Sequence, residues 1–358
     1  MSRPVLFVTN YAPAFRVGAF ARLHEREEVV FALVGGRVRH AGAAPAGALS
    51  FPVLRPSQRH VARLAGSGRF RAVIAGLSGR VALPAAYAGA RAAGVPFVLW
   101  ATIWRHPRTA AHALSYLPLR HLYRHADAIV TYGPHVSAYV RSKGSRGPVV
   151  AAPQSVDGGF WEAPAEPRRR AGFQVLYAGR LEREKGVEPL LAAWSRTGLR
   201  PPDAALVMAG DGPLRASAAA AGASVTDRPL APGELRDLYA GSDVVVVPSI
   251  PTRDFLEPWG LVVNEALHRS VPVVATTAVG AAAGGLVVHE RTGLVVPPGD
   301  PAALAAALRR LHDDAGLRSR LGAAGHAAVA AHSHDAWATG MQRALAAVGA
   351  AKGGEGGC

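Results

Sequence analysis

Short apolar segments alternate with longer segments of mixed polarity along most of the chain. In the first half, six brief segments rich in β-branched residues and bounded by Gly, Pro or Asn predict strands at residues 5–9, 29–36, 72–76, 96–100, 128–133 and 148–153. Intervening segments such as 57–65 and 114–126 have the spacing of helices. Continuous apolar strands that alternate with helices are typical of a parallel sheet covered on both faces.

A second alternation follows a break in the pattern. Strands are predicted again at residues 174–179, 205–210, 224–227, 244–249, 272–276 and 293–298. The break between the two series is rich in Pro, Gly and Arg. The pattern therefore predicts two Rossmann-like α/β domains that face each other across a cleft, with ligands at the carboxyl ends of the strands.

The expected organisation has five parts. These are a basic N-terminal acceptor domain at 1–152, a linker at 153–172, a donor domain at 173–335, a helix at 336–351 that packs back toward the first domain, and a disordered Gly-rich tail at 352–358.

Length and composition restrict the class of protein. The 358 residues suffice for about two domains, and a hydrophobic fraction of 49% excludes a disordered chain. The single cysteine, Cys358, allows no internal disulfide and no cysteine-based metal site, which favours a reducing compartment. Residues 5–9 are too short for a signal sequence, and Pro and Gly interrupt the uncharged run at 270–288. We therefore expect a cytoplasmic protein.

The net positive charge of the chain lies entirely in the first half. Residues 1–170 contain 23 basic and 7 acidic residues, whereas residues 171–358 contain 17 and 18. Such a basic half implies an anionic partner, which is nucleic acid, anionic lipid or a phosphorylated substrate. No nucleic-acid partner is expected, because zinc-ligand spacing, an RNA-binding aromatic motif and a basic recognition helix are all missing from the sequence.

Membrane docking is a further use of this charge. Basic residues recur beside apolar ones at 55–65 and 119–125. Segments of this kind bind anionic leaflets, which would place the protein peripherally on the inner face of the cell membrane. An ordinary solvated helix face explains the same pattern, and both readings stay open.

Two turns that directly follow predicted strands are candidates for binding phosphate groups. Arg180 and Lys185 follow the strand at 174–179 and flank a helix start, where two cations and a helix N-terminus suit a diphosphate. A solvated, charged helix entry is the alternative. Gly210 lies in a second turn, which by itself indicates only close backbone approach.

The segment 255–266 is the most specific motif. Glu257 and Glu265 are eight positions apart, and we expect Pro258 in the first turn of a helix with Glu265 about two turns inside. Two carboxylates so placed can accept hydrogen bonds from the vicinal hydroxyls of a sugar. A capping glutamate together with a buried structural one is the alternative.

These motifs carry a resemblance to a known family. Residues 174–303 contain AGRL…KG, AGDGPL, LYAGSDVVVVPS, EPWGLVVNEA and TGLVVPPGDPAAL in that order, and this region resembles the C-terminal half of family 4 glycosyltransferases with the GT-B fold. The resemblance implies sugar transfer from a nucleotide-diphosphate donor, with UDP or GDP expected first, to a hydroxyl acceptor with retention at the anomeric carbon. Membrane docking would suit a lipid-linked acceptor, and a precursor of a cell-envelope glycan is the other acceptor that we expect.

The resemblance assigns roles to residues of the second half. Arg180 and Lys185 would bind the donor diphosphate, and Glu257 would contact the donor sugar near the reacting centre. Gly210 would lie in the donor-binding site. Glu265 would hold the ribose hydroxyls. The backbone N–H groups of Trp259, Gly260 and Leu261 would help to bind the sugar and phosphates.

The N-terminal half matches the family less closely. Gly18 is the one glycine where such enzymes carry a Gly-Gly loop, and residues 153–157 read PQSVD where PNGVD is usual. His106 is the candidate for a catalytic histidine near the sugar, and Trp104 for the acceptor side. An exposed loop histidine and a core aromatic are the respective alternatives.

Other functions fit parts of the sequence. No Asp-x-Asp occurs, so we expect a hexosyltransferase that needs neither a metal nor another cofactor. A nucleotide-sugar 2-epimerase of the same architecture would isomerise the donor without an acceptor. A basic protein that binds nucleic acid or membranes without catalysis is the alternative from a different class.

Overall fold

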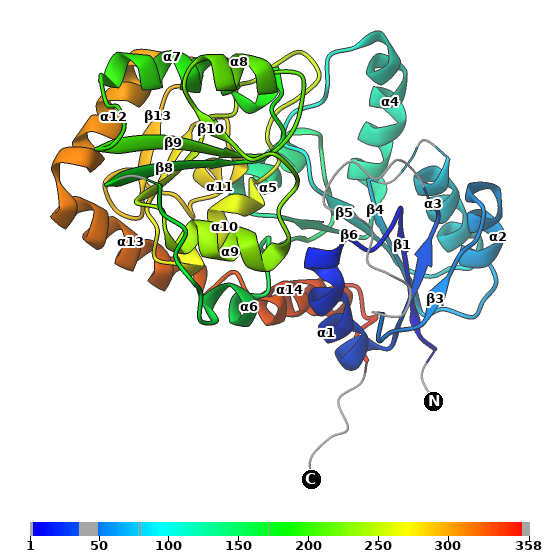
Figure 1. Ribbon diagram of the computed structural model, residues 1–358. Coiled ribbons are helices and arrows are strands. Elements are labelled where there is room, and N and C mark those ends of the chain that lie inside the picture. Colours follow the sequence, from blue (N-terminus) through cyan, green and yellow to red (C-terminus); the bar gives the residue numbers. More distant parts are fainter. Residues whose placement is uncertain (1–2, 36–48, 78, 80, 171, 353–358) are drawn as a thin grey trace. The chain divides into compact units, whose positions relative to one another are not determined.

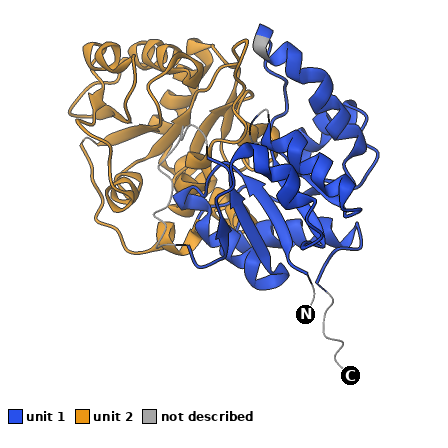
Figure 2. Cartoon of the chain, turned by 90° about the vertical axis from the view of Figure 1, so that its right-hand side faces the viewer, with its two compact units in different colours: residues 1–156, 333–358 blue, residues 157–332 orange. Residues whose placement is uncertain are grey.

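The chain forms two α/β units, each built on its own parallel sheet (Figures 1 and 2). The computed structural model describes residues 3–35, 49–77, 79, 81–170 and 172–352. Unit 1 comprises Met1–Val156 and Ser333–Cys358, and unit 2 comprises Asp157–His332. Two parallel-sheet α/β units are the architecture expected from the sequence. The cleft expected between them stays a prediction, and the tail at 353–358 lies outside the described residues.

Unit 1 contains a seven-stranded sheet in the order β3-β2-β1-β4-β5-β6-β7. The strands are β1 (Val5–Thr9), β2 (Val29–Leu33), β3 (Val53–Leu54), β4 (Ala72–Gly76), β5 (Phe97–Ala101), β6 (Ala128–Thr131) and β7 (Val149–Ala151). The helices are η1 (Ala14–Arg16), α1 (Val17–Glu27), η3 (Gln58–His60), α2 (Val61–Ala65), α3 (Ala82–Ala92), α4 (Ala110–His125), α5 (Pro134–Ser142) and α14 (His334–Ala346). The two-residue β3 is missing from the sequence prediction because so short a strand has no periodicity.

Unit 2 contains a six-stranded sheet in the order β10-β9-β8-β11-β12-β13. The strands are β8 (Phe173–Ala178), β9 (Ala204–Ala209), β10 (Ser224–Val225), β11 (Val244–Val247), β12 (Val273–Thr276) and β13 (Leu294–Val296). The helices are α6 (Gly158–Glu162), η4 (Arg183–Lys185), α7 (Val187–Thr197), α8 (Arg215–Ala220), α9 (Pro232–Ala240), α10 (Leu261–His268), α11 (Gly280–Ala283), α12 (Pro301–Asp313) and α13 (Ala315–Val329).

Burial explains why these segments form strands. Every residue of β1, β4, β5 and β8 is buried, as expected for strands covered on both faces. The uncharged run at 270–288 forms β12, where the sequence predicts a strand, and then the short helix α11. Within the described ranges, no helix has the length and apolar character needed to cross a membrane.

The core of unit 1 contains residues from both ends of the chain. α14 lies beside α1, red against blue in Figure 1. The Trp337 ring centroid is 5.7 Å from that of Phe20, 5.8 Å from that of Trp100 and 6.4 Å from that of Phe7. The fully buried Trp337 therefore closes a cluster built on β1, α1 and β5. Trp100 therefore belongs to this core.

We expect Trp337→Ala to destabilise unit 1 by about 3–5 kcal/mol, because it removes a fully buried indole from the aromatic cluster. Urea unfolding followed by tryptophan fluorescence measures the change. Leu117→Ala is the control, since Leu117 is 69% exposed and its truncation should change stability by less than about 0.5 kcal/mol. Similar losses in both variants would contradict the role assigned to α14.

Candidate functional site

The strand order of unit 2 marks a place for a ligand. The chain leaves β8 toward β9 and leaves β11 toward β12, so its direction across the sheet reverses between β8 and β11. In open parallel sheets, ligands bind outside the carboxyl ends of the strands at such a reversal. Arg180 and Lys185 follow β8, and Ser249 and Glu257 follow β11. The fold therefore gathers the predicted cations and the first glutamate at this edge.

Lys185 and Glu257 form a direct ion pair. The Lys185 Nζ lies 2.5 Å from Glu257 Oε2, and Ser249 Oγ donates to the same oxygen at 3.1 Å. The side chains of Lys185 and Glu257 are 16% and 9% exposed. The Phe255 ring lies 4.9 Å from the Lys185 ammonium. The lysine is therefore held in place by a carboxylate and an aromatic face, and the pair is largely shielded from water.

Arg180 is held by its own loop. Its guanidinium donates to Glu182, and it lies 3.5 Å from Glu184 Oε1. The Tyr177 hydroxyl donates to the Arg180 carbonyl at 2.5 Å, which fixes the backbone directly after β8. Burial, together with Glu182 beside it, raises the pKa of Glu184. Arg180 is 34% exposed, so its cation remains accessible to a ligand.

The turn before α10 corrects one expectation. The helix begins at Leu261 rather than at Pro258, because Gly260 has a left-handed φ of 89° and interrupts the helix there. Glu265 consequently lies one turn inside α10 and not two. The Trp259 side chain is buried, and its indole N–H donates to Asn264 Oδ1 at 2.7 Å. This anchor fixes the backbone of residues 259–261 at the mouth of the helix.

Glu265 lies in a partly buried position. The Tyr239 hydroxyl donates to its Oε2 at 2.7 Å. Burial raises the pKa of the Glu265 carboxyl to about 7, and the hydrogen bond from Tyr239 offsets part of that rise. The carboxyl group therefore takes up and releases its proton near neutral pH.

Three glycines let the loops of this edge touch. A Cβ on Gly186 would overlap the carbonyl of Pro248, one on Gly210 that of Gly179, and one on Gly280 that of Pro258. Close packing thus explains a glycine at position 210, and its contact with the donor stays a prediction. Backbone hydrogen bonds join the same loops, for example from Gly280 N to the Glu257 carbonyl at 3.1 Å.

The candidates in unit 1 have defined surroundings. His106 donates from Nε2 to the carbonyl of His112 at 2.8 Å, and the Trp104 ring packs edge-on against His135 with centroids 5.2 Å apart. A Cβ on Gly18 would overlap the ring of His334. Close packing accounts for a glycine at position 18, and the catalytic and acceptor roles of these three residues stay predictions.

Sequence reasoning missed several residues of the site. The Ser249 hydroxyl donates to Glu257, and the Tyr177 hydroxyl donates to the Arg180 carbonyl. The Tyr239 hydroxyl donates to Glu265. Ser249 had a signal in the sequence, because it is the polar residue at the end of the apolar segment 244–249. Tyr239 had none, since its contact with Glu265 spans 26 positions. Within the part of the chain that the structure describes, no cluster of three or more His, Cys, Asp or Glu side chains could hold a metal ion.

A family model matches the region of the chain that contains this site. Residues 172–314 match the family model "Glycosyl transferases group 1". The glycogen synthase of Mycobacterium tuberculosis is 29% identical over 56% of this chain and 49% of its own length. The alpha-D-kanosaminyltransferase of Streptomyces kanamyceticus is 30% identical over 66% of each chain. The chain thus spans about half to two thirds of the length of these relatives.

Solved structures share the fold over nearly the whole chain. The crystal structure of Anabaena HepE in complex with UDP superposes with a TM-score of 0.73 over 96% of this chain and 99% of HepE, at 18% identity. The two parallel-sheet units therefore have the GT-B fold expected from the sequence.

Gly186→Ala should cost far more stability than Gly222→Ala. Both glycines have left-handed φ, of 73° and 82°, so alanine is strained by about 1–2 kcal/mol at either position. Only at Gly186 does the added methyl meet a backbone carbonyl, which should add about 1–3 kcal/mol. Urea unfolding of the two variants measures the difference, and equal losses would show that the loops do not pack as described.

Glu265→Gln should stabilise the protein more in alkaline than in acidic buffer. Between the unfolded pKa of 4.5 and the folded pKa of about 7, the folded chain binds more protons than the unfolded one. The free energy of unfolding therefore falls as the pH rises through this window. Glutamine cannot ionise, and its carbonyl oxygen can still accept from Tyr239.

Thermal unfolding without nucleotide at about pH 5 and about pH 8 measures the effect. The midpoint difference between Glu265→Gln and the unaltered protein should be larger at the higher pH. A difference that is independent of pH would contradict the burial of this carboxyl group.

Proposed function

We propose that the protein transfers a hexose from a nucleotide-diphosphate donor to a hydroxyl acceptor, with retention at the anomeric carbon and without a metal. The observation that carries the proposal is the Lys185–Glu257 pair, which lies with Arg180 at the reversal point of the unit 2 sheet. The relatives named as sugar transferases support the reaction class. UDP is the first nucleotide to test, because HepE has been solved with UDP bound.

The two cations would bind the donor diphosphate. As the glycosidic bond breaks, negative charge grows on the leaving phosphate, and fixed cations stabilise the transition state more than the ground state. Lys185 is already oriented by Glu257 and Phe255, so little reorganisation is required. At Arg180 the diphosphate has to compete with Glu182 and Glu184.

Glu257 would act on the sugar side of the breaking bond. While the phosphate gains negative charge, the anomeric centre gains positive charge. A carboxylate 2.5 Å from an ammonium provides the complementary pair of charges, provided that Glu257 faces the sugar and Lys185 the phosphate. Gly210 and the backbone of residues 259–261 complete the donor site in this proposal.

Glu265 would bind the ribose. Hydroxyl groups that donate to its oxygens favour the ionised carboxylate, and the pKa of about 7 falls when they bind. Nucleotide binding near neutral pH should therefore release a proton. The acceptor would come from the unit 1 side, where His106, Trp104 and Gly18 are the candidates. A lipid-linked or polysaccharide precursor, met at the membrane surface by a cytoplasmic protein, is the acceptor that we favour.

Lys185→Met should lower the rate of donor turnover by a factor on the order of 10², because it removes a fixed cation from the leaving phosphate. The measurement is nucleotide release from UDP-glucose and from GDP-sugars, with and without candidate acceptors. Lys352→Met is the matched control, since Lys352 is exposed and pairs with Glu28 in unit 1.

Near-normal turnover in Lys185→Met, or an equal loss of turnover in the control, would contradict the role of Lys185 at the leaving phosphate. Magnetic resonance spectra of the sugar in the same reactions test the epimerase alternative. Isomerised donor in the absence of acceptor would replace the transferase proposal.

A further inference from the structure

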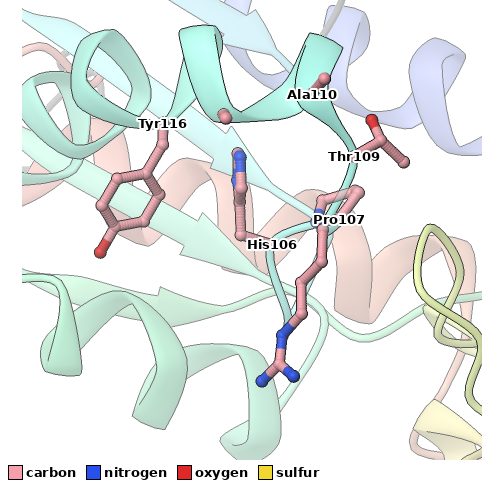
Figure 3. A pocket seen from close by; sticks show the side chains of 7 residues that line it. His106, Pro107, Thr109, Ala110 and Tyr116 are labelled. Atoms are coloured by element: carbon pink, nitrogen blue, oxygen red, sulfur yellow. The ribbon is translucent and has the colours of Figure 1, made fainter.

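The carboxyl edge of the unit 1 sheet holds a hollow and a buried cation. The hollow, of about 410 Å³, lies beneath the first turns of α4, where Figure 3 shows His106 and Tyr116. It belongs to the acceptor side proposed above. The cation is Arg16, which ends η1 in the segment after β1 and is only 3% exposed. The proposed reaction gives this buried guanidinium no role.

Four aromatic rings surround the Arg16 guanidinium. The centres of the Trp100, Tyr132 and Trp337 rings lie 4.8, 5.8 and 5.7 Å from its Cζ, and that of Phe15 lies at 5.4 Å. This aromatic shell draws on η1, β5, the turn after β6 and α14. Aromatic faces attract a cation, but they are only weak acceptors for its N–H groups.

The charge of Arg16 has no carboxylate to balance it. Its guanidinium donates to the neutral side-chain oxygen of Gln154, and it forms no ion pair with an acidic residue among those that the structure describes. The sequence explains this lack, because residues 29–156 supply most of the surroundings and contain a single acid, Asp127. That carboxylate pairs with Arg91 at 3.0 Å. Burial lowers the pKa of Arg16, yet an arginine in a protein keeps its proton.

Three buried nitrogen donors of this shell lack a hydrogen-bond partner within the described part of the chain. They are Arg16 Nη1, Trp100 Nε1 and Trp337 Nε1. Buried donors in folded proteins are almost always paired with protein groups or with ordered water, and each exception requires an explanation. A water molecule would satisfy a donor but would leave the positive charge unbalanced, and a buried charge without a partner is costly. A small anion would provide both the acceptor and the balancing charge.

We infer that the aromatic shell around Arg16 binds one monovalent inorganic anion of the chloride type. This inference goes beyond the proposed transferase function and does not depend on it. One cation matches one negative charge, and a guanidinium that is 3% exposed offers no surface to a larger phosphorylated ligand. The anion would fix the segment 10–16 after β1, where the strand order of unit 1 reverses between β1 and β4.

Thermal unfolding in the absence of nucleotide measures the binding. Sodium chloride replaces sodium gluconate at a constant ionic strength of about 0.15 M, so that screening of surface charges stays the same. A ligand that binds only the folded chain raises its stability along a saturating curve, so the unfolding midpoint should rise by a few degrees and then level off. A midpoint that is independent of chloride would overturn the inference.

Gln154→Glu is the sharpest variant, because it puts a carboxylate where the Arg16 guanidinium already donates and hardly changes the shape of the side chain. The chloride dependence of the midpoint should disappear, and in gluconate alone the variant should unfold at a higher temperature than the unaltered protein. Gln342→Glu is the matched control, since it makes the same charge change on a half-buried side chain of α14. Chloride dependence that persists in Gln154→Glu, or that is lost equally in the control, would contradict the proposed site.

Crystals soaked in sodium bromide locate the ion, because bromide takes the place of chloride and scatters X-rays anomalously. An anomalous peak within hydrogen-bond reach of Arg16 Nη1 is expected in the unaltered protein and not in Gln154→Glu. A water molecule without anomalous signal at that place would overturn the inference.

Failure of this inference is separable from failure of the proposed function, because neither experiment contains nucleotide. A protein that shows the chloride dependence but binds no UDP or GDP would refute the donor site alone. A protein that binds UDP but shows no chloride dependence and no bromide peak would refute the anion site alone.

Discussion

The contact of backbone with backbone at the carboxyl edge of the unit 2 sheet is the constraint on which the candidate site depends. Gly186, Gly210 and Gly280 each lie where a Cβ would overlap a carbonyl of a neighbouring loop. Only because these loops approach so closely can a lysine that follows β8 reach a glutamate that follows β11. The glycines of the motifs therefore allow the loops to pack closely, and this packing positions the charged side chains between them.

The two units differ in how their cations are balanced by carboxylates. In unit 2 the cations at the site are balanced by carboxylates nearby, so its chemistry depends on orientation and burial more than on net charge. In unit 1 the segment 29–156 contains sixteen Lys and Arg but a single acidic residue, Asp127, which pairs with Arg91. Cations that are held by nearby carboxylates favour the differential stabilisation of a transition state. An excess of cations over carboxylates favours the binding of an anion.

Sequence reasoning reached the fold, and it proposed Arg180, Lys185 and Glu257 as site residues without their contacts. Strand-helix alternation predicts both sheets, and the order of the motifs predicts that Arg180, Lys185 and Glu257 gather at one edge. The pairing of Lys185 with Glu257 joins positions 72 apart and depends on loop packing that no local pattern encodes. The same holds for Tyr239 and for the pKa of Glu265, because burial is a tertiary property. The start of α10 was wrong by three residues because the left-handed turn at Gly260 overrides the preference of proline for a first helical turn.

The place of Trp337 gives the chain an unusual order of assembly. The aromatic cluster under β1 and β5 holds residues from the first hundred positions, yet it is closed by a helix that leaves the ribosome only after all of unit 2. Domains usually fold as units during synthesis, N-terminal first. Here the first unit to emerge is the last to be completed. Until α14 arrives, Phe7, Phe20 and Trp100 lack a wall of their cluster, which makes the nascent first unit a natural client for chaperones.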